Sequence, residues 1–381
     1  MIRKVVSFFI PLFLLAVAGT IIAFGRGYRI DFIEKEVKTT GILVATSDPD
    51  GAQIFIDGKF TGATNSNLTL EPGLYEVVIK KEGYQDWGKK VHIRAEGVIK
   101  TDAILFRSNP SLSPLLNTNA ADPILSPDGI RIAYIATPSA SPEENLGDLN
   151  LILNKPTLFI FDMTSRNNPF NKNPRPYEGV ASDLLSSWES EDKTLKEIAL
   201  SKFPEEFTSI ASSSGKIIAF SADETKVLYE ATEAATLERV IDPSLLGAGS
   251  VEEKRDLESG KIYVYDAKED KNFGIDDLAM PKEEKRNISP ARQLKTLVTP
   301  TPQFPKKLNF GWFGNSANLY VIEENKISLM EYSGENKVIV YSGPFVDSYV
   351  FPHPNGKEFV ILTNLNPGGF PNPSLYTVNV R

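Results

Sequence analysis

The chain has 381 residues, enough for two or three domains, and its apolar fraction of 41% allows ordinary hydrophobic cores. Its formal net charge of −8 argues against general nucleic-acid binding, so no nucleic-acid partner is expected. Cysteine is absent, which excludes disulfides, thiolate nucleophiles and cysteine-ligated metal sites.

The N-terminal segment predicts a membrane anchor. Residues Val5–Phe24 contain no charged side chain, and about 20 apolar residues span a bilayer core as a helix. We assign 1–30 to a single transmembrane anchor and 31–40 to a linker. Long domains after such an anchor translocate largely regardless of charge, so the expected location is the cell membrane, with the later domains outside the cytoplasm. The Ala-x-Ala stretch Ala16–Ala18 leaves a cleaved signal peptide as the alternative.

Residues 41–107 predict a small antiparallel β-sandwich. Short runs of β-rich or alternating residues recur through this stretch, and glycine-containing pairs such as Asp50-Gly51 and Asp57-Gly58 separate them. The predicted strands lie within Ile42–Ser47, Ala52–Asp57, Leu74–Tyr84, Lys89–Arg94 and Val98–Phe106.

The stretch Ser47–Gly62, SDPDGAQIFIDGKFTG, has the composition of a ligand loop but not its spacing. An EF-hand counted from Asp48 would place Lys59 where a calcium-binding Glu belongs. Phe60 stands where a phosphate-binding P-loop needs Ser or Thr. The stretch therefore predicts a strand followed by a hairpin turn at Asp57-Gly58.

This segment resembles the PEGA domain, a small exported β-sandwich named for its Pro-Glu-Gly-Ala turn. The turn here is Pro49-Asp50-Gly51-Ala52, and the resemblance continues through Ile54–Thr64, Glu71–Trp87 and Val98–Phe106. It implies a binding or spacer module of the cell envelope and brings no catalytic residues. We propose a candidate aromatic ligand-binding face, with core packing as the alternative, formed by Tyr75, Tyr84 and Trp87.

From residue 108 onward a drifting repeat appears. A Ser-Pro-Asp-Gly turn at 126–129 joins two apolar runs within Asp122–Ala136, and a third run follows at Thr157–Met163. Related runs recur around turns near residues 222, 315 and 355. This pattern resembles the blades of a β-propeller of the TolB or WD40-like kind. We therefore assign 108–381 to a β-propeller-like domain with insertions, with four visible blades and up to six allowed by the wide spacing of the first turns.

Four segments of this domain carry expectations of their own. Ser182–Phe207 and Ala235–Gly260 mix helical periodicity with charge and predict helical insertions. Ser111–Thr118 is expected to supply the outer strand of the last blade, because ring closure removes exposed strand edges. The Pro-rich Thr299–Lys307 is interpreted as a connector, with an extended partner-binding segment as the alternative.

Residues suited to catalysis are sparse. With only two histidines, His92 and His353, a His-based triad or metal site is hard to build, and no Gly-x-Ser-x-Gly elbow occurs. We interpret the acidic run Glu269, Asp270, Asp276 and Asp277 as a solvated loop, with a calcium site as the alternative. Structural roles are also expected for the turn-forming Asp128, Asp162 and Asp266, and for Trp188 and Trp312 as packing residues.

These features together predict an all-β protein in which a PEGA-like sandwich and a β-propeller follow one transmembrane helix. The expected function is non-catalytic binding or scaffolding at the cell envelope, with an envelope protein or glycan as partner and no metal or cofactor. The alternative is an envelope enzyme, a propeller-based hydrolase or lyase. A deep channel lined by clustered Asp, Glu or Arg would favour that alternative.

Overall fold

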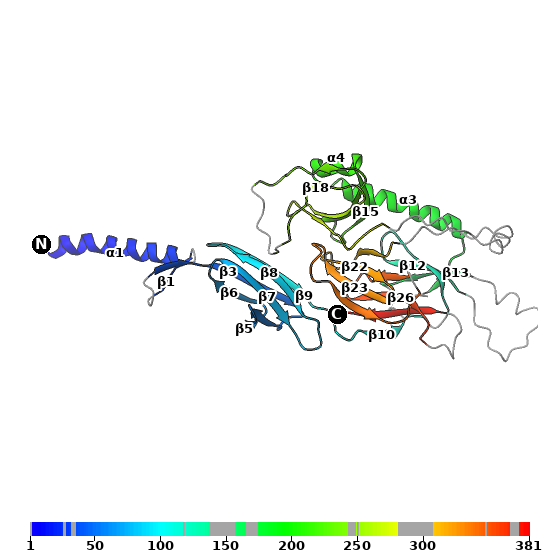
Figure 1. The fold of residues 1–381 in the computed structure, drawn as a ribbon, viewed down its shortest axis with the longest axis horizontal. Coiled ribbons are helices and arrows are strands. Elements are labelled where there is room, and N and C mark those ends of the chain that lie inside the picture. The colour runs from blue at the N-terminus through cyan, green and yellow to red at the C-terminus, as the bar shows by residue number, and fades with distance from the viewer. Residues whose placement is uncertain are drawn as a thin grey trace, which may run out of the picture. The chain divides into compact units, whose positions relative to one another are not determined.

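The computed structural model describes residues 2–25, 28–31, 36–116, 119–136, 157–164, 174–242, 249, 251–280, 308–346, 349–365 and 373–381. The chain forms two compact units, with the main boundary between Phe106 and Arg107 (Figure 1). The first contains the N-terminal helix and a β-sandwich, and the second contains repeated four-stranded sheets.

Helix α1 spans Ile2–Gly25. The large apolar side chains described on it are exposed, among them Phe13 at 68% and Leu15 at 72%. Within the part of the chain that the structure describes, no helix meets the length and hydropathy of a membrane span. The anchor expected at Val5–Phe24 therefore remains a prediction.

A short antiparallel hairpin follows α1. Strand β1 spans Tyr28–Asp31 and strand β2 spans Glu36–Thr39, with Tyr28 opposite Thr39. Within the segment assigned as the linker 31–40, residues 36–39 thus form a strand that pairs with β1. Because Tyr28 pairs with Thr39, the two ends of the hairpin lie side by side.

The sandwich has two sheets, with the strand orders β5-β4-β7-β8 and β6-β3-β9 (Figure 1). Inward residues such as Ile54 and Ile79 are fully buried, as the alternating pattern predicted. The predicted turn at Asp57-Gly58 is confirmed, since both residues have the positive φ of a tight hairpin turn, 48° and 77°. The strands are β3 (Gly41–Asp48), β4 (Gln53–Ile56), β5 (Lys59–Ala63), β6 (Ser66–Leu70), β7 (Gly73–Lys80), β8 (Trp87–Ile93) and β9 (Val98–Ile104).

One strand pair corrects the antiparallel prediction. Strand β3 pairs with β9 in parallel, from Ile42 opposite Val98 to Asp48 opposite Ile104. The reason is a crossover: after β8 the chain passes to the other sheet at the end where β3 begins, and there the Glu96 N–H donates to Thr40 O at 3.0 Å. The chain therefore enters the sandwich at one end and leaves it at the other.

The second unit contains, within the described ranges, four four-stranded antiparallel sheets, here called blades 1 to 4. Repeated four-stranded sheets of this kind are the blades of a β-propeller, so the four visible blades are confirmed. Blade 1 is β11 (Ala121–Leu125), β12 (Arg131–Ala136), β13 (Thr157–Asp162) and β14 (Arg175–Pro176). Blade 2 is β15 (Gly215–Phe220), β16 (Lys226–Ala231), β19 (Ile262–Asp266) and β20 (Lys271–Gly274).

Blade 4 is completed by the strand that precedes blade 1. Strand β10 pairs with β27, with Ser111 opposite Asn379, which confirms the closing role expected of Ser111–Thr118. Blade 3 is β21 (Phe310–Trp312), β22 (Asn318–Glu323), β23 (Lys326–Glu331) and β24 (Val338–Ser342). Blade 4 is β25 (Val350–Pro352), β26 (Glu358–Thr363), β27 (Ser374–Asn379) and β10 (Ser111–Pro114).

The blades bury their apolar faces against one another. One core joins blade 4 to blade 1, with Phe351 and Leu375 packed in the same cluster as Tyr134. A second core joins blades 2 and 3. Blades 3 and 4 meet through the rings of Phe313 and Phe359, whose centroids are 4.8 Å apart. The hydrophobic pattern of each strand thus serves the contact between blades as well as the blade itself.

Two helices lie in the chain between blades 1 and 2 (Figure 1). Helix α3 spans Ala181–Leu200 and helix α4 spans Glu205–Ser213, which confirms the helical insertion predicted at Ser182–Phe207. Trp188 of α3 packs against blade 1 and Phe207 of α4 against blade 2, and both are buried. Trp312 is also buried, so both tryptophans are packing residues as expected.

The insertion inside blade 2 differs from its prediction. Its described part contains a two-stranded ribbon and no helix, with β17 (Ala235–Thr236) paired with β18 (Asp256–Leu257). The helical expectation for Ala235–Gly260 is therefore wrong in this part. Leu237 and Leu257 are buried in the core of blade 2, so tertiary packing overrides the helical period.

The blade 3 and blade 4 turns approach backbone to backbone, and this predicts a sensitive glycine. A Cβ on Gly314 would lie 2.8 Å from His353 O, so Gly314→Ala is expected to lower the free energy of unfolding by about 1–3 kcal/mol through overpacking. Denaturant unfolding of the purified chain measures this. Gly274→Ala is the matched control, because its Cβ would meet only the flexible Lys254 side chain. Equal losses in the two variants would contradict the backbone clash.

Candidate functional site

Each blade opens with the same turn between its first two strands. In blade 1 the Ser126 N–H donates to Arg131 O at 2.8 Å, and the Ile130 N–H donates to Asp128 Oδ1 at 3.0 Å. Each of the other three blades has the same two hydrogen bonds, in turns that begin at residues 221, 313 and 353. The turn-forming role of Asp128 is therefore confirmed, as it is for Asp162 and Asp266, which accept N–H bonds from Thr164 and Lys268.

The four turns together are here called the turn face: residues 126–131, 221–226, 313–318 and 353–358. The Asp223 N–H donates to Ser316 Oγ at 2.9 Å, which joins the turns of blades 2 and 3. Glu191 of helix α3 forms an ion pair with Arg131 of blade 1. Lys202, which follows α3, forms an ion pair with Glu224 of blade 2. Within the turn face Asp128 pairs with Arg131, while Glu224 and Asp223 pair with Lys202 and Lys268 outside it.

The turn of blade 2 predicts a pH dependence of stability. Burial alone would raise the pKa of Asp223, but hydrogen bonds from Ser221 and Thr225 and the charge of Lys226 outweigh it and lower the pKa to about 2. The folded pKa lies below the ordinary value of about 3.9, so the stabilisation is present above pH ~4 and is lost as the pH falls towards 2.

Asp223→Asn removes this titration. We expect the variant to be less stable than the parent at neutral pH and to lose less stability between pH 4 and pH 2, about the range set by the two pKa values. Unfolding midpoints measured across that range test it. Asp183→Asn, an exposed acid in the first turn of α3, is the control. Parallel pH profiles for the parent and Asp223→Asn would contradict the prediction.

The two histidines have separate structural positions. His353 is 8% exposed, and its Nδ1 accepts the Asn355 N–H at 3.1 Å, so it is a structural residue of the blade 4 turn. His92 lies on the exposed side of β8 in the first unit. Among the residues that the structure describes, no group of three or more His, Asp or Glu side chains is arranged to hold a metal ion.

The three aromatic residues proposed as a ligand-binding face do not form an exposed surface. Trp87 is 5% exposed and belongs to the sandwich core, and Tyr75 and Tyr84 pack against the same core while partly buried. The Tyr75 hydroxyl donates to Glu71 O at 3.0 Å. These positions correspond to the core-packing alternative, because alternate residues of β7 and β8 turn inward.

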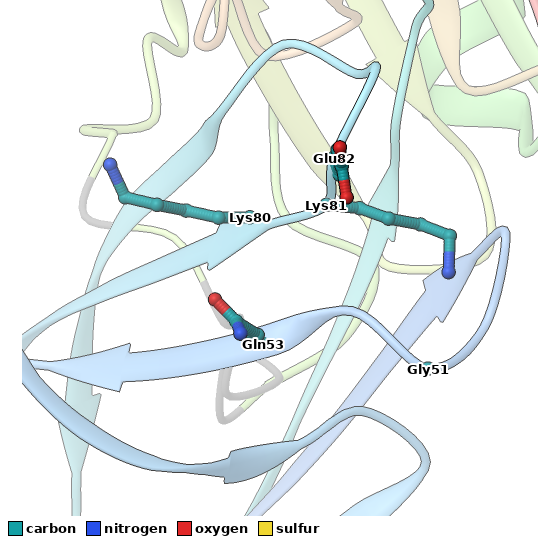
Figure 2. Close-up of a pocket in the computed structure, with 5 residues that line it drawn as sticks. All are labelled: Gly51, Gln53, Lys80, Lys81 and Glu82. Atoms are coloured by element: carbon teal, nitrogen blue, oxygen red, sulfur yellow. The ribbon is translucent and has the colours of Figure 1, made fainter.

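Figure 2 shows a hollow of about 580 Å³ whose described lining residues are Gly51, Gln53, Lys80, Lys81 and Glu82. The two lysine side chains point in opposite directions (Figure 2). Lys80 is paired with Asp86, and Lys81 Nζ donates to Asp50 O at 2.9 Å. Because these cations are already bound and do not converge, the hollow is not a built anion site.

A buried charge cluster in blade 2 escaped the sequence analysis. The solvated-loop interpretation is wrong for Asp270, whose side chain is 2% exposed and accepts Arg255 Nη2 at 3.0 Å. Its other oxygen accepts the Val240 and Ile241 N–H groups, each at 2.8 Å. The remaining acids of that run are exposed or half-exposed and pair with lysines. The cation lies 15 residues upstream in the insertion, so no local spacing signals the pair.

This cluster holds the insertion on blade 2. Arg255 also donates to the backbone oxygen of Glu238 at 2.8 Å, and the Tyr265 hydroxyl donates to Asp270 at 3.0 Å. The groups satisfy one another, so the cluster is a structural clip.

Residues 40–109 match the family model of the PEGA domain, which confirms that resemblance. No curated protein matches the chain. Among solved structures, a TolB protein of Agrobacterium tumefaciens is 10% identical, with 86% of this chain and 78% of that chain covered and a TM-score of 0.20. TolB of Acinetobacter baumannii is 10% identical, with 90% and 63% covered and a TM-score of 0.21.

An oligogalacturonate lyase of Vibrio parahaemolyticus is also similar, at 8% identity, with 93% of this chain and 96% of that chain covered and a TM-score of 0.22. These likenesses are too slight to bear on function. The blade assignment above rests on the strand pairing of this chain itself.

Proposed function

We propose that the protein is an envelope protein, anchored by α1, whose blades form a non-catalytic binding or scaffolding platform for an envelope protein or glycan. The observation that carries the proposal is the parallel pairing of β3 with β9. It makes the sandwich a spacer: the chain enters at Gly41 and leaves after β9, about 26 Å away for an eight-residue strand.

Two further observations support the proposal. The exposed apolar side chains of α1 suit a lipid environment, where they cost nothing to expose. The turn face is a polar surface of hydrogen-bonded turns, which suits shape-dependent binding more than proton transfer. The PEGA match agrees with an envelope location, since the resemblance implies one.

Protease treatment of intact cells that produce the protein tests the location. We expect the blades to be digested while a cytoplasmic marker survives. Protection of the blades until the cells are lysed would contradict an exported platform.

Binding is tested with the detergent-solubilised full chain as bait for purified envelope fractions. We expect retention of a protein or glycan component, weakened by Lys268→Glu. Lys268 borders the turn face: its side chain is 66% exposed and its Nζ lies 3.6 Å from Asp223 Oδ2. Lys59→Glu, exposed after the Asp57-Gly58 turn of the sandwich, is the matched control. Retention of nothing, or equal effects of the two variants, would contradict binding at the turn face.

A further inference from the structure

One end of the sandwich exposes large apolar side chains. Ile42 is 37% exposed, Leu74 62% and Val98 63%. Within the described part of the sandwich, the other exposed large apolar side chain is that of Phe60, which meets Phe55 edge-on at 5.8 Å between ring centroids. Ile42 and Val98 are neighbours on the outer face of the β3–β9 pair, and Leu74 lies on the outer face of β7.

These three side chains come from two different sheets but lie at the same end. Ile42 is opposite Val98, and both stand at the beginning of parallel strands. Leu74 is the second residue of β7 and is opposite His92 near the end of β8. The turn after β8 joins these strand ends, because the Ile42 N–H donates to Gly97 O at 2.9 Å. We call this end of the sandwich, with Ile42, Leu74 and Val98, the tether end, because β3 begins there.

The β1–β2 hairpin holds the tether end close to α1. Tyr28 is paired with Thr39, so the shortest path from Gly25 to Gly41 uses three residues, one strand-to-strand step and two more residues. At no more than about 3.5 Å per residue and roughly 5 Å between strands, this path is at most about 23 Å.

The charges at this end nearly balance. Lys90, Arg94 and Lys100 are exposed cations near this end, and the exposed acids there are Glu71, Glu76, Glu96 and Asp102. Glu76 is opposite Lys90, and Asp102 is ion-paired with Lys100. Attraction to anionic lipid is therefore weak here. Apolar side chains among mixed charges suit the headgroup region of a bilayer, where the apolar groups leave water and the charged groups stay in it.

We propose that the tether end lies on the lipid surface, with Leu74, Val98 and Ile42 in the headgroup region. This inference rests on the proposed anchoring of the chain by α1. Contact at this end sets the sandwich upright on the membrane, with its other end, where the chain continues to the blades, directed away from the bilayer.

The absence of cysteine allows a direct test, because each introduced cysteine is the only one in the chain. The full chain, reconstituted in phosphatidylcholine vesicles, carries a nitroxide on Leu74→Cys or Val98→Cys. Glu82→Cys, in the exposed turn at the other end of β7, is the control, and Leu14→Cys reports on α1. The measured quantity is the ratio of collisions with oxygen, which enters lipid, to collisions with a water-soluble nickel chelate.

We expect a severalfold higher ratio at Leu74 and Val98 than at Glu82, with little change when anionic lipid is added. If Leu14 reports lipid while Leu74 and Val98 match Glu82, the anchor holds and the surface contact is overturned. If Leu14 reports water, the anchoring itself fails and the inference falls with it. Spin–spin broadening between labels at Leu74 would assign this surface to a second copy of the chain and also overturn the proposal.

Discussion

Arg255→Met is expected to lower the free energy of unfolding by about 3–5 kcal/mol, because it leaves the buried carboxylate of Asp270 without its cation. Arg255 and Asp270 side chains are 12% and 2% exposed, and the guanidinium also binds Glu253. Removing one partner of a buried pair lowers stability by more than an exposed pair contributes, because the remaining charge stays buried without its partner. Denaturant unfolding of the purified chain measures the loss.

Lys254→Met is the matched control for this variant. Lys254 precedes Arg255 and pairs with Asp276, but both side chains are about half exposed or more, 47% and 68%. Exposed pairs contribute about 0–1 kcal/mol, so the control should change stability little. Similar losses in the two variants would contradict the role assigned to the buried clip.

The pH dependence of Arg255→Met gives a second measure. Burial raises the pKa of Asp270, but the Ile241 and Val240 N–H groups and the Arg255 guanidinium outweigh it and hold the pKa below its ordinary value. In the parent this carboxylate therefore stabilises the fold above its unfolded pKa, and that stability is lost as the pH falls through the folded pKa. Without Arg255 the folded pKa rises, so the acid-induced loss of stability should begin at a higher pH.

Phe207→Ala is expected to lower the free energy of unfolding by about 3–5 kcal/mol, the usual range for removing a buried aromatic ring. Phe207 is fully buried, stacks on Tyr265 with centroids 4.6 Å apart, and meets Tyr229 edge-on at 5.3 Å. It is the ring through which α4 packs on blade 2, so the variant should also loosen that helix. Unfolding measurements and amide exchange of residues 205–213 test both effects.

Phe60→Ala is the control for Phe207→Ala. Its ring is 58% exposed, so its removal opens no cavity and should change stability by only about 0.5 kcal/mol. A small loss of unfolding free energy in Phe207→Ala would contradict the anchoring role of this ring. So would faster amide exchange that is spread over the whole chain and not concentrated in α4.

Local sequence patterns predicted the elements in which one period and one turn chemistry agree. The alternation in Gln53–Ile56 with the Asp57-Gly58 turn specified a hairpin, and the repeated turn with an Asp or Asn at its third position specified the blades. These signals lie within a few residues of the structure they produce. The closing strand at Ser111–Pro114 was also predictable, because a ring of sheets leaves one outer position empty.

Patterns that depend on distant partners were predicted less well. The sequence of Ala235–Gly260 has helical spacing, but its buried leucines pack on blade 2 from a ribbon. Trp87 and Tyr75 have the composition of a binding face, but their strand parity turns them into the core. In both places the burial of apolar area outweighs the local preference.

The sequence by itself determined the class of this protein: an apolar N-terminal segment, a PEGA-like sandwich and a repeated blade domain without a catalytic motif. Only the tertiary structure decided that β9 lies parallel to β3, that Asp270 is buried against Arg255, and that Ile42, Leu74 and Val98 share one end. Each of these joins residues far apart in the chain. A backbone pairing between strands, a buried ion pair and a shared strand end each depend on partners that only the folded chain brings together, so no local spacing records them.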